Sequence, residues 1–453
     1  MPAKRTSSVA ALISAVALIF AGAAPALAAV SDNQQQLTAF DPPLSVSSCA
    51  GVAIKTHPST GKTLLAFIQP DSTTTYDGML VVGLVDANGA LEGSLVQVST
   101  TISSMAPSDC APPSLAAGPD GTWLVMWALN TSPPESAIAG QIVSQTGNLI
   151  GPNFSISDDS YEDIETVSAA WSATDSRYLV TWKAQVDLRT SPFGELNSQQ
   201  VVGQFIDEAG TRIGANFLVT NLADGVDNNQ DLAFGSGIWV AVFSEDGDIP
   251  KGQIITPAGL QGSAFELSSE AQSYYGPGVV YNRATEQFLV TFWESAGEAT
   301  KHLRLLDSGG SPLGSDKVYV AGGSRPRTVA VGAGGYVMTW HSANIIRAQA
   351  FDANLQVVGE QYQISSDALT SAFRPELTCV AGGIVFAYWG KVAPDGGTPA
   401  SNIYSNKVAV ECDSYLLPET NGVGSILTPV FVILAGLTAA AGIGLRVRGV
   451  QRV

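Results

Sequence analysis

Acidic side chains in three loops are the residues of this sequence whose type and spacing could support chemistry. Carboxylates gathered in one loop attract cations and offer hydrogen-bond acceptors to a partner. Two of the loops are predicted to form a ligand-binding surface, through Asp158, Asp159, Glu162 and Asp163 in the first and Glu245, Asp246 and Asp248 in the second.

The third loop has the composition of a Ca²⁺ site. Asp224, Asp227, Asn229 and Asp231 lie two or three residues apart, and Gly225 permits a sharp turn among them. Ca²⁺ takes six to eight oxygen ligands from carboxylates and carbonyls in such loops. Ca²⁺ is therefore the one cofactor that the sequence suggests. A solvated acidic rim without bound metal is the alternative interpretation.

The sequence lacks the residue patterns of familiar catalytic sites. Its three histidines, His57, His302 and His341, do not have the spacing of metal ligands. There is no Gly-x-Ser-x-Gly elbow, phosphate-binding loop or dinucleotide fingerprint. We therefore predict no catalytic residue, and binding is favoured over catalysis.

The overall charge excludes one class of partner. The chain of 453 residues has 40 acidic against 22 basic residues, for a formal net charge of −18. Nucleic-acid binding needs clustered Lys and Arg, so no nucleic-acid partner is expected. Hydrophobic residues make up 45% of the chain, which excludes intrinsic disorder and predicts a sizeable core.

One short phrase recurs seven times and indicates the elements that must position these loops. Tyr178-Leu179-Val180-Thr181-Trp182 is its clearest copy, and copies follow one another at intervals of 48 to 61 residues. Each copy ends in an aromatic residue, which we interpret as core packing between sheets rather than as a sugar-stacking platform. These residues are Phe67, Trp127, Trp182, Phe243, Phe292, Trp340 and Tyr388.

Each repeat is predicted to contain four short strands. A Gly-Gln phrase such as 202–207 follows the aromatic phrase, and a Phe-x-Ile-Ser phrase such as 154–157 follows that. Alternating apolar positions with β-branched and aromatic residues favour strands over helices. Four strands in about 50 residues match a propeller blade, so we predict an all-β, seven-bladed β-propeller of four-stranded antiparallel blades. A linear array of small β-sandwiches is the alternative.

The ring, residues 29–412, is predicted to close through an N-terminal strand. The last repeat lacks a fourth strand, and Leu44–Ser48 resembles the fourth-strand phrase of other repeats. Closure of this kind removes an exposed sheet edge. The predicted blades span residues 49–108, 109–163, 164–228, 229–275, 276–324, 325–373 and 374–412, the last completed by strand 44–48.

Four cysteines, an even number, predict two disulfide bonds in an oxidising compartment. Cys379 and Cys412 lie within the seventh repeat, whereas Cys49 and Cys110 precede the first and second repeats at equivalent positions. We favour the pairs Cys49–Cys110 and Cys379–Cys412. A Cys49–Cys412 bond across the seam of the ring is the rival.

The N-terminus has the features of a secretory signal peptide. In residues 1–28, Lys4 and Arg5 precede an uncharged apolar stretch, and Ala26-Leu27-Ala28 offers small residues for cleavage after Ala28. We therefore expect the protein to be exported.

The C-terminus has three parts. A linker (413–424) precedes an uncharged segment (425–445) long enough to cross a bilayer, and a basic tail (446–453) is predicted to stay cytoplasmic. The linker contains Leu417, Pro418, Glu419, Thr420 and Asn421. This arrangement resembles a bacterial sortase-type sorting signal, Leu-Pro-x-Thr-Gly, with Asn421 in place of the glycine. The resemblance implies a sortase-like processing enzyme as a partner, and a plain membrane anchor is the alternative.

The repeat resembles a family of secreted bacterial proteins with recurring Y-L-V-x-W, G-Q-x-F-D-x-x-G and F-x-I-S units, similar to kelch-like propellers. The resemblance implies the propeller architecture and leaves the function open. We expect a non-catalytic, surface-displayed protein that binds an extracellular protein or glycan through an acidic top face. A propeller glycoside hydrolase or lyase that uses top-face carboxylates is one alternative, and a structural envelope component is another. Inner-strand phrases are mostly small and apolar, with Asp231 and Glu376 as exceptions.

Overall fold

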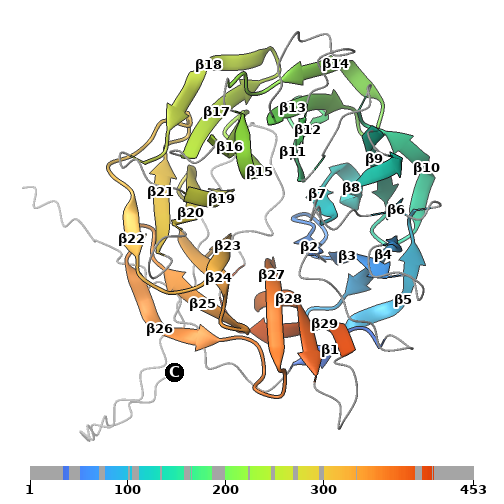
Figure 1. Ribbon diagram of the computed structural model, residues 1–453, viewed down its shortest axis with the longest axis vertical. Helices are drawn as coiled ribbons and strands as arrows, with labels where there is room; N and C mark the ends of the chain where they lie inside the picture. The colour runs from blue at the N-terminus through green and yellow to red at the C-terminus, as the bar shows by residue number, and fades with distance from the viewer. Residues whose placement is uncertain are drawn as a thin grey trace, which may run out of the picture. The chain divides into compact units, whose positions relative to one another are not determined.

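The structure, a computed structural model, describes most of the repeat region. The described residues are 34–39, 51–70, 77–99, 103–104, 112–132, 135–157, 164, 166–185, 199–222, 225–245, 250–268, 274–294, 300–332, 334–392, 400–410 and 412. They form seven antiparallel sheets arranged in a ring, each with at least four strands (Figure 1). The protein is therefore an all-β, seven-bladed β-propeller, as the sequence predicts.

In each of the first three blades the chain begins at the inner strand and runs outwards. Blade 1 contains β2 (Val52–Thr56), β3 (Thr63–Pro70), β4 (Asp77–Val85) and β5 (Leu91–Gln97), and β6 (Ser103–Ser104) pairs with β4. Blade 2 contains β7 (Ser114–Ala117), the 3-10 helix η1 (Pro119–Gly121), β8 (Trp123–Ser132), β9 (Glu135–Val143) and β10 (Leu149–Ser155). Blade 3 contains β11 (Val167–Ser172), β12 (Arg177–Gln185), β13 (Gln199–Ile206) and β14 (Arg212–Leu218).

Blades 4 to 7 repeat the same order of strands. Blade 4 contains β15 (Val226–Gly235), β16 (Ile238–Glu245), β17 (Pro250–Thr256) and β18 (Gly259–Glu266). Blade 5 contains β19 (Tyr274–Asn282), β20 (Gln287–Glu294), β21 (Lys301–Leu306) and β22 (Lys317–Tyr319). Blade 6 contains β23 (Ser324–Val331), β24 (Gly335–Ser342), β25 (Ile345–Phe351) and β26 (Val357–Gln363). Blade 7 contains β27 (Ser371–Val380), β28 (Gly383–Val392), β29 (Ala400–Val408) and β1 (Gln35–Gln36).

The second strand of each blade forms the hydrophobic core. In blade 4, β16 is buried from Trp239 to Ser244, whereas the outermost strand β18 is exposed along most of its length. The second strand packs against neighbouring blades on both faces, which explains its continuous apolar run. All seven repeat aromatics are at most 2% exposed, so they pack in the core as predicted: Phe67, Trp127, Trp182, Phe243, Phe292, Trp340 and Tyr388.

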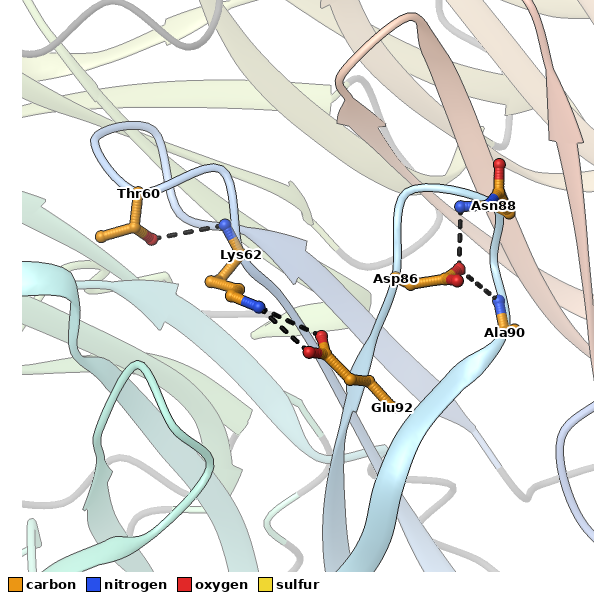
Figure 2. A network of polar contacts seen from close by, with 6 residues as sticks. All are labelled: Thr60, Lys62, Asp86, Asn88, Ala90 and Glu92. Carbon is orange, nitrogen blue, oxygen red and sulfur yellow. Dashed lines mark hydrogen bonds and ion pairs between the residues drawn. The ribbon is translucent and has the colours of Figure 1, made fainter.

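Many acids of the repeat have a structural role in the outer hairpin. Figure 2 shows the turn between β4 and β5, where Asp86 Oδ1 accepts hydrogen bonds from the backbone N–H groups of Asn88 (2.8 Å) and Ala90 (2.9 Å). Lys62 and Glu92 form an exposed ion pair of 3.1 Å nearby (Figure 2). Such Asp turns satisfy backbone donors that no strand partner reaches. The same bonds recur at Asp207, Asp307 and Asp352.

The repeated glutamine holds the β-bulge between the two outer strands. Gln204 Nε2 donates to the carbonyl oxygens of Phe205 (2.8 Å), Ile213 (3.3 Å) and Gly214 (3.2 Å). The bulge interrupts the ladder between β13 and β14, and the side-chain amide supplies donors to carbonyls there. Equivalent bonds are made by Gln141, Gln253 and Gln349.

An N-terminal strand closes the ring, but its position differs from the prediction. Gln35 and Gln36 pair with Ser405 and Tyr404 of β29 and complete blade 7. The Gln34 side chain adds bonds from the Ser366 N–H (2.9 Å) and the Tyr388 hydroxyl (2.8 Å). The predicted closing strand, 44–48, lies outside the described residues.

One predicted disulfide bond is present. Cys379 of β27 bonds to Cys412, which follows β29, with their Cα atoms 5.6 Å apart. The bond ties the inner strand of blade 7 to the end of the ring. Cys49 and Cys110 lie outside the described residues.

The predicted targeting segments also lie outside the described part of the chain. These are residues 1–28, the linker 413–424 with its sorting motif, the apolar segment 425–445 and the tail 446–453. Among the residues that the structure describes, no helix is long and apolar enough to cross a membrane.

Candidate functional site

A pocket at the centre of the ring is the site to which every blade contributes. The inner strands β2, β7, β11, β15, β19, β23 and β27 stand around the centre of the ring (Figure 1). Residues of these strands line the pocket, whose cavity volume is about 200 Å³. We call it the central pocket. Its charged lining residues are Lys55, Asp231, Arg327 and Glu376. Inner strands begin, and second strands end, on the same face of the ring, which we call the top face.

Asp231 is held in place by three hydrogen bonds. Its Oδ1 accepts from the Ser168 hydroxyl (2.8 Å) and the Leu232 N–H (2.8 Å), and its Oδ2 accepts from the Val279 N–H (3.0 Å). The donors come from β11, β15 and β19, so this carboxylate connects three neighbouring blades. These three bonds fix the orientation of the carboxylate.

Glu376 and Arg327 form an ion pair between blades 7 and 6. The Arg327 Nε donates to Glu376 Oε1 at 2.7 Å, and each side chain is 29% exposed. Burial raises the pKa of Glu376, although Arg327 opposes that shift. The pair shows that a guanidinium group in this pocket can bind a carboxylate.

Two further arginines stand where β23 and β27 begin. Arg325 and Arg374 each precede a proline and have positive φ values of 57° and 51°. A positive φ is unusual for a residue with a side chain and stores local strain, which is characteristic of functional sites. Bulges at these positions interrupt both ladders. Burial lowers the pKa of Arg374 to about 9, with repulsion from Arg325 and Arg327 acting in the same direction.

His341 lies beside this arginine cluster. It pairs in register with Ser324, the residue before Arg325, at the end of β24. Its Nε2 is buried and has no hydrogen-bond partner among the residues that the structure describes. Burial lowers its pKa, and the Arg325 charge lowers it further. Both effects favour the neutral imidazole.

The other two histidines have structural partners. His57 Nε2 contacts the carbonyl oxygen of Gly118 at 2.8 Å and links blades 1 and 2. His302 Nδ1 lies 2.7 Å from Asp316 Oδ2, and its ring stacks on Phe292. Neither histidine lines the central pocket.

A half-buried aromatic pair lies on the top face of blade 5. Tyr275 and Trp293 are register partners where β19 begins and β20 ends, with ring centroids 5.4 Å apart. Pro277 and Gly278, just along β19, line the central pocket. The pair thus gives the top face of blade 5 an apolar, partly exposed surface, and neither ring is among the residues that line the central pocket.

The structure describes few of the predicted acidic loop residues. Glu245 is one, and its carboxylate forms an ion pair with Lys251 of the same blade. The backbones of Asp227 and Asn229 lie in β15, while Asp231 points into the central pocket. Outside the described residues lie Asp158, Asp159, Glu162, Asp163, Asp224, Asp246 and Asp248. Within the described part of the chain, no three His, Cys, Asp or Glu side chains come together as a metal site, and the Ca²⁺ site stays a prediction.

The sequence indicated the acids of the central pocket but not its cations. The sequence marks Asp231 and Glu376 as inward-facing acids, but it does not mark Lys55 and Arg327, the cations that line the pocket. It does not mark Arg325 and Arg374 either, which lie near the starts of β23 and β27. An Arg-Pro dipeptide at the start of two successive inner strands was the available signal.

The raised pKa of Glu376 predicts a pH-dependent difference in stability between the wild type and Glu376→Gln. The Glu376 carboxyl group binds its proton more tightly in the folded state than in the unfolded chain. Protonated Glu376 therefore stabilises the fold below its ordinary pKa of 4.5, and this contribution is lost as the pH rises. The free energy of unfolding of the wild type, minus that of the variant, should fall as the pH rises above 4.5 and through the raised pKa of Glu376. Urea titrations across this range measure it. A difference that grows with pH would mean that pairing with Arg327 outweighs burial.

Comparisons with known proteins identify the fold. No protein-family model and no curated protein matches the chain. Among solved structures, the polysaccharide lyase Uly1 is 8% identical with a TM-score of 0.50, and the match covers 84% of this chain and 94% of that chain. The WD40 domain of Toxoplasma gondii coronin is 11% identical with a TM-score of 0.49, covering 88% and 90%. The hemagglutinin-neuraminidase ectodomain of parainfluenza virus 5 is 9% identical with a TM-score of 0.46, covering 85% of each chain. At these identities the likeness concerns the fold alone.

Proposed function

We propose that this protein is a non-catalytic binding module that recognises an extracellular glycan at the top face, with the central pocket as its recognition site. The observation that carries the proposal is the pocket itself. All seven inner strands line it, and it holds charged side chains in a ring whose inner phrases are otherwise mostly small and apolar. A concave site with a few convergent polar groups is the usual form of a ligand site.

Binding fits the pocket better than hydrolysis does, because the carboxylates of Asp231 and Glu376 already bond to other groups of the protein. Glycoside hydrolysis generally requires one carboxyl group as acid and a second as base or nucleophile. Asp231 accepts three protein hydrogen bonds, and Glu376 is paired with Arg327. The raised pKa of Glu376 is the observation that favours the alternative, a propeller hydrolase or lyase with Glu376 as the acid.

The proposal includes display at the cell surface. It rests on the signal-peptide features of residues 1–28 and on the linker, apolar segment and basic tail at 413–453. Retention would occur through the apolar segment or through processing by a sortase-like enzyme at Leu417–Asn421. Acidic top-face loops, with or without Ca²⁺, would then surround the pocket and tune access to it.

A glycan array that scores both binding and cleavage tests this proposal. The purified full-length chain is applied to immobilised neutral and acidic oligosaccharides, and the soluble fraction is analysed by mass spectrometry. We expect retention on a subset of the glycans with no shortened products. Release of cleaved or unsaturated fragments would assign the enzymatic alternative, and failure to bind any glycan would refute the proposed function.

A further inference from the structure

We propose that the central pocket binds an uncharged sugar unit, with the Asp231 carboxylate as an acceptor for its hydroxyl groups. The inference rests on the proposed function and narrows the glycan to one whose bound unit has no charge. It is carried by the balance of charge in the pocket, by the open space beside Asp231 that Gly278 leaves, and by buried hydroxyl groups without partners on the pocket wall.

The charged side chains that line the central pocket balance one another. They are two cations and two anions: Lys55, Arg327, Asp231 and Glu376. One cation and one anion already contact each other, because the Arg327 Nε donates to Glu376 Oε1 at 2.7 Å. A charged ligand group that left water for this pocket would meet repulsion as well as attraction, so the loss of its hydration would not be offset. An uncharged ligand avoids that cost.

Asp231 offers a preorganised acceptor to such a ligand. Among the residues that the structure describes, its Oδ1 accepts from the Ser168 hydroxyl and the Leu232 N–H, whereas its Oδ2 accepts from the Val279 N–H alone. A carboxylate oxygen has two lone-pair sites, so Oδ2 can accept one further hydrogen bond. Because blades 3, 4 and 5 already hold this side chain, it loses little freedom when a ligand hydroxyl donates to it.

Gly278 leaves room for a ligand atom beside this oxygen. A Cβ atom at Gly278 would lie 3.6 Å from Asp231 Oδ2 and 3.6 Å from Thr291 Oγ1, which would place it in the space next to both oxygens. Gly278 does not have a positive φ, so the backbone conformation does not require glycine at this position. The missing side chain instead keeps two groups that can bond to a sugar hydroxyl open to the pocket.

Two further hydroxyl groups on the pocket wall lack hydrogen-bond partners. The Oγ1 atoms of Thr166 and Thr328 are buried and have no partner within the described part of the chain, although both residues line the pocket. Buried polar groups in native proteins are normally hydrogen-bonded, so each exception calls for a reason. A threonine hydroxyl both donates and accepts, and it rotates to suit its partner. Sugar hydroxyl groups have the same versatility and can satisfy both threonines.

The size of the cavity agrees with a single sugar unit. A volume of about 200 Å³ is below the roughly 300–1,000 Å³ of pockets that enclose whole drug-sized ligands. The pocket therefore receives one unit of a larger ligand. A sugar ring carries several hydroxyl groups on a small frame, which matches a pocket that offers both donors and acceptors.

Isothermal titration calorimetry with matched uncharged and charged trisaccharides tests the inference. The full-length chain is titrated with three pairs: cellotriose and its form oxidised to a carboxylate at each C6, the methyl ester of trigalacturonate and trigalacturonate itself, and triacetylchitotriose and the cationic N-trimethylated chitotriose. We expect at least one uncharged sugar to bind. Its charged partner should bind about tenfold or more weakly, since the charge gives up hydration without a matching group in the pocket.

Two variants locate the uncharged sugar. Gly278→Val fills the space beside Asp231 without a change of charge, and it should weaken binding by about tenfold or more. Asp231→Asn should weaken binding to a similar extent, because a hydrogen bond to a charged acceptor is lost. Ala215→Val, on the exposed outer strand of blade 3, also enlarges a strand residue and should leave binding unchanged. Circular dichroism melts show which variants are folded, and Gly278→Val decides the test if Asp231→Asn is not.

Each contrary result has a distinct meaning. Equal or tighter binding of the charged partner would overturn the inference and leave a glycan-binding module that accepts charged units. Binding that folded Gly278→Val leaves unchanged would place the sugar outside the space beside Asp231 and overturn the inference as well. If none of the uncharged trisaccharides binds while the array retains other glycans, the inference fails and the proposed function stands.

Discussion

Replacing Trp340 by alanine should lower the free energy of unfolding by about 3–5 kcal/mol, the usual cost of deleting a large core aromatic. Trp340 is fully buried in the second strand of blade 6. It packs edge-on against Tyr319, and the Lys301 ammonium group lies 5.3 Å from its ring centre. The deletion removes apolar contacts between blades 5 and 6 and leaves a cavity that the surrounding β-sheets cannot fill.

Trp293→Ala is the matched control for this substitution. Trp293 also ends a second strand, in blade 5, but it is half-buried at the top face. Its removal should cost no more than about 1 kcal/mol, since it leaves little enclosed space. Urea titrations followed by far-ultraviolet circular dichroism compare the two. Equal losses of stability would contradict the view that the repeat aromatics form the core and that Trp293 lies on the partly exposed top face of blade 5.

Removing the Cys379–Cys412 bond should destabilise the protein by roughly 3.7 kcal/mol, the loop-closure value for a bond that spans 33 residues. The bond restricts the unfolded chain, and it fixes the end of β29 beside the inner strand of blade 7. The double variant Cys379→Ala/Cys412→Ala tests this with the same urea titration. Both cysteines are fully buried, and alanine keeps the site apolar.

Reduction of the wild type supplies the control for the disulfide. If this bond accounts for the loss, mild reductant should lower the stability of the wild type much more than that of the double variant. A double variant as stable as the oxidised wild type would show that the blade contacts alone hold the seam. Disulfide mapping of the unreduced protein would at the same time show whether Cys49 and Cys110 are paired.

The sequence predicts the propeller well because each blade must satisfy the same packing rule. A second strand that is buried on both faces needs a continuous apolar run that ends in a large residue. A large aromatic residue therefore occupies the same position in successive repeats, as Trp182 and Trp340 do. The Asp207 turn and the Gln204 side chain recur because their bonds serve backbone geometry that every outer hairpin shares. Local rules of this kind leave a signature in the sequence.

The closing strand shows where such rules give no information. The Leu44–Ser48 phrase resembles other outer strands, yet Gln35 and Gln36 pair with β29. Two residues held mainly by backbone hydrogen bonds need no particular side chains, so the pairing leaves no pattern to find.

The arginine cluster could not be predicted for a different reason. Arg325 and Arg374 are separated by 49 residues in the sequence, and their charges influence each other only because the ring places β23 beside β27. Their proximity depends on the bulges near the starts of β23 and β27. It depends also on which side chains of each strand face the central pocket. Without the ring geometry, each arginine looks like an isolated loop residue.

Hydrogen exchange of backbone amides, with and without an oligosaccharide that the glycan array retains, tests the central claim most directly. Ligand in the central pocket should slow exchange at Arg327 and Thr328 of β23 and at Glu376 and Leu377 of β27, all of which line it. The outer strands β18 and β26 should be unchanged. Protection confined to outer strands, with none at the inner ones, would place the ligand elsewhere and contradict the assignment of the central pocket as the recognition site.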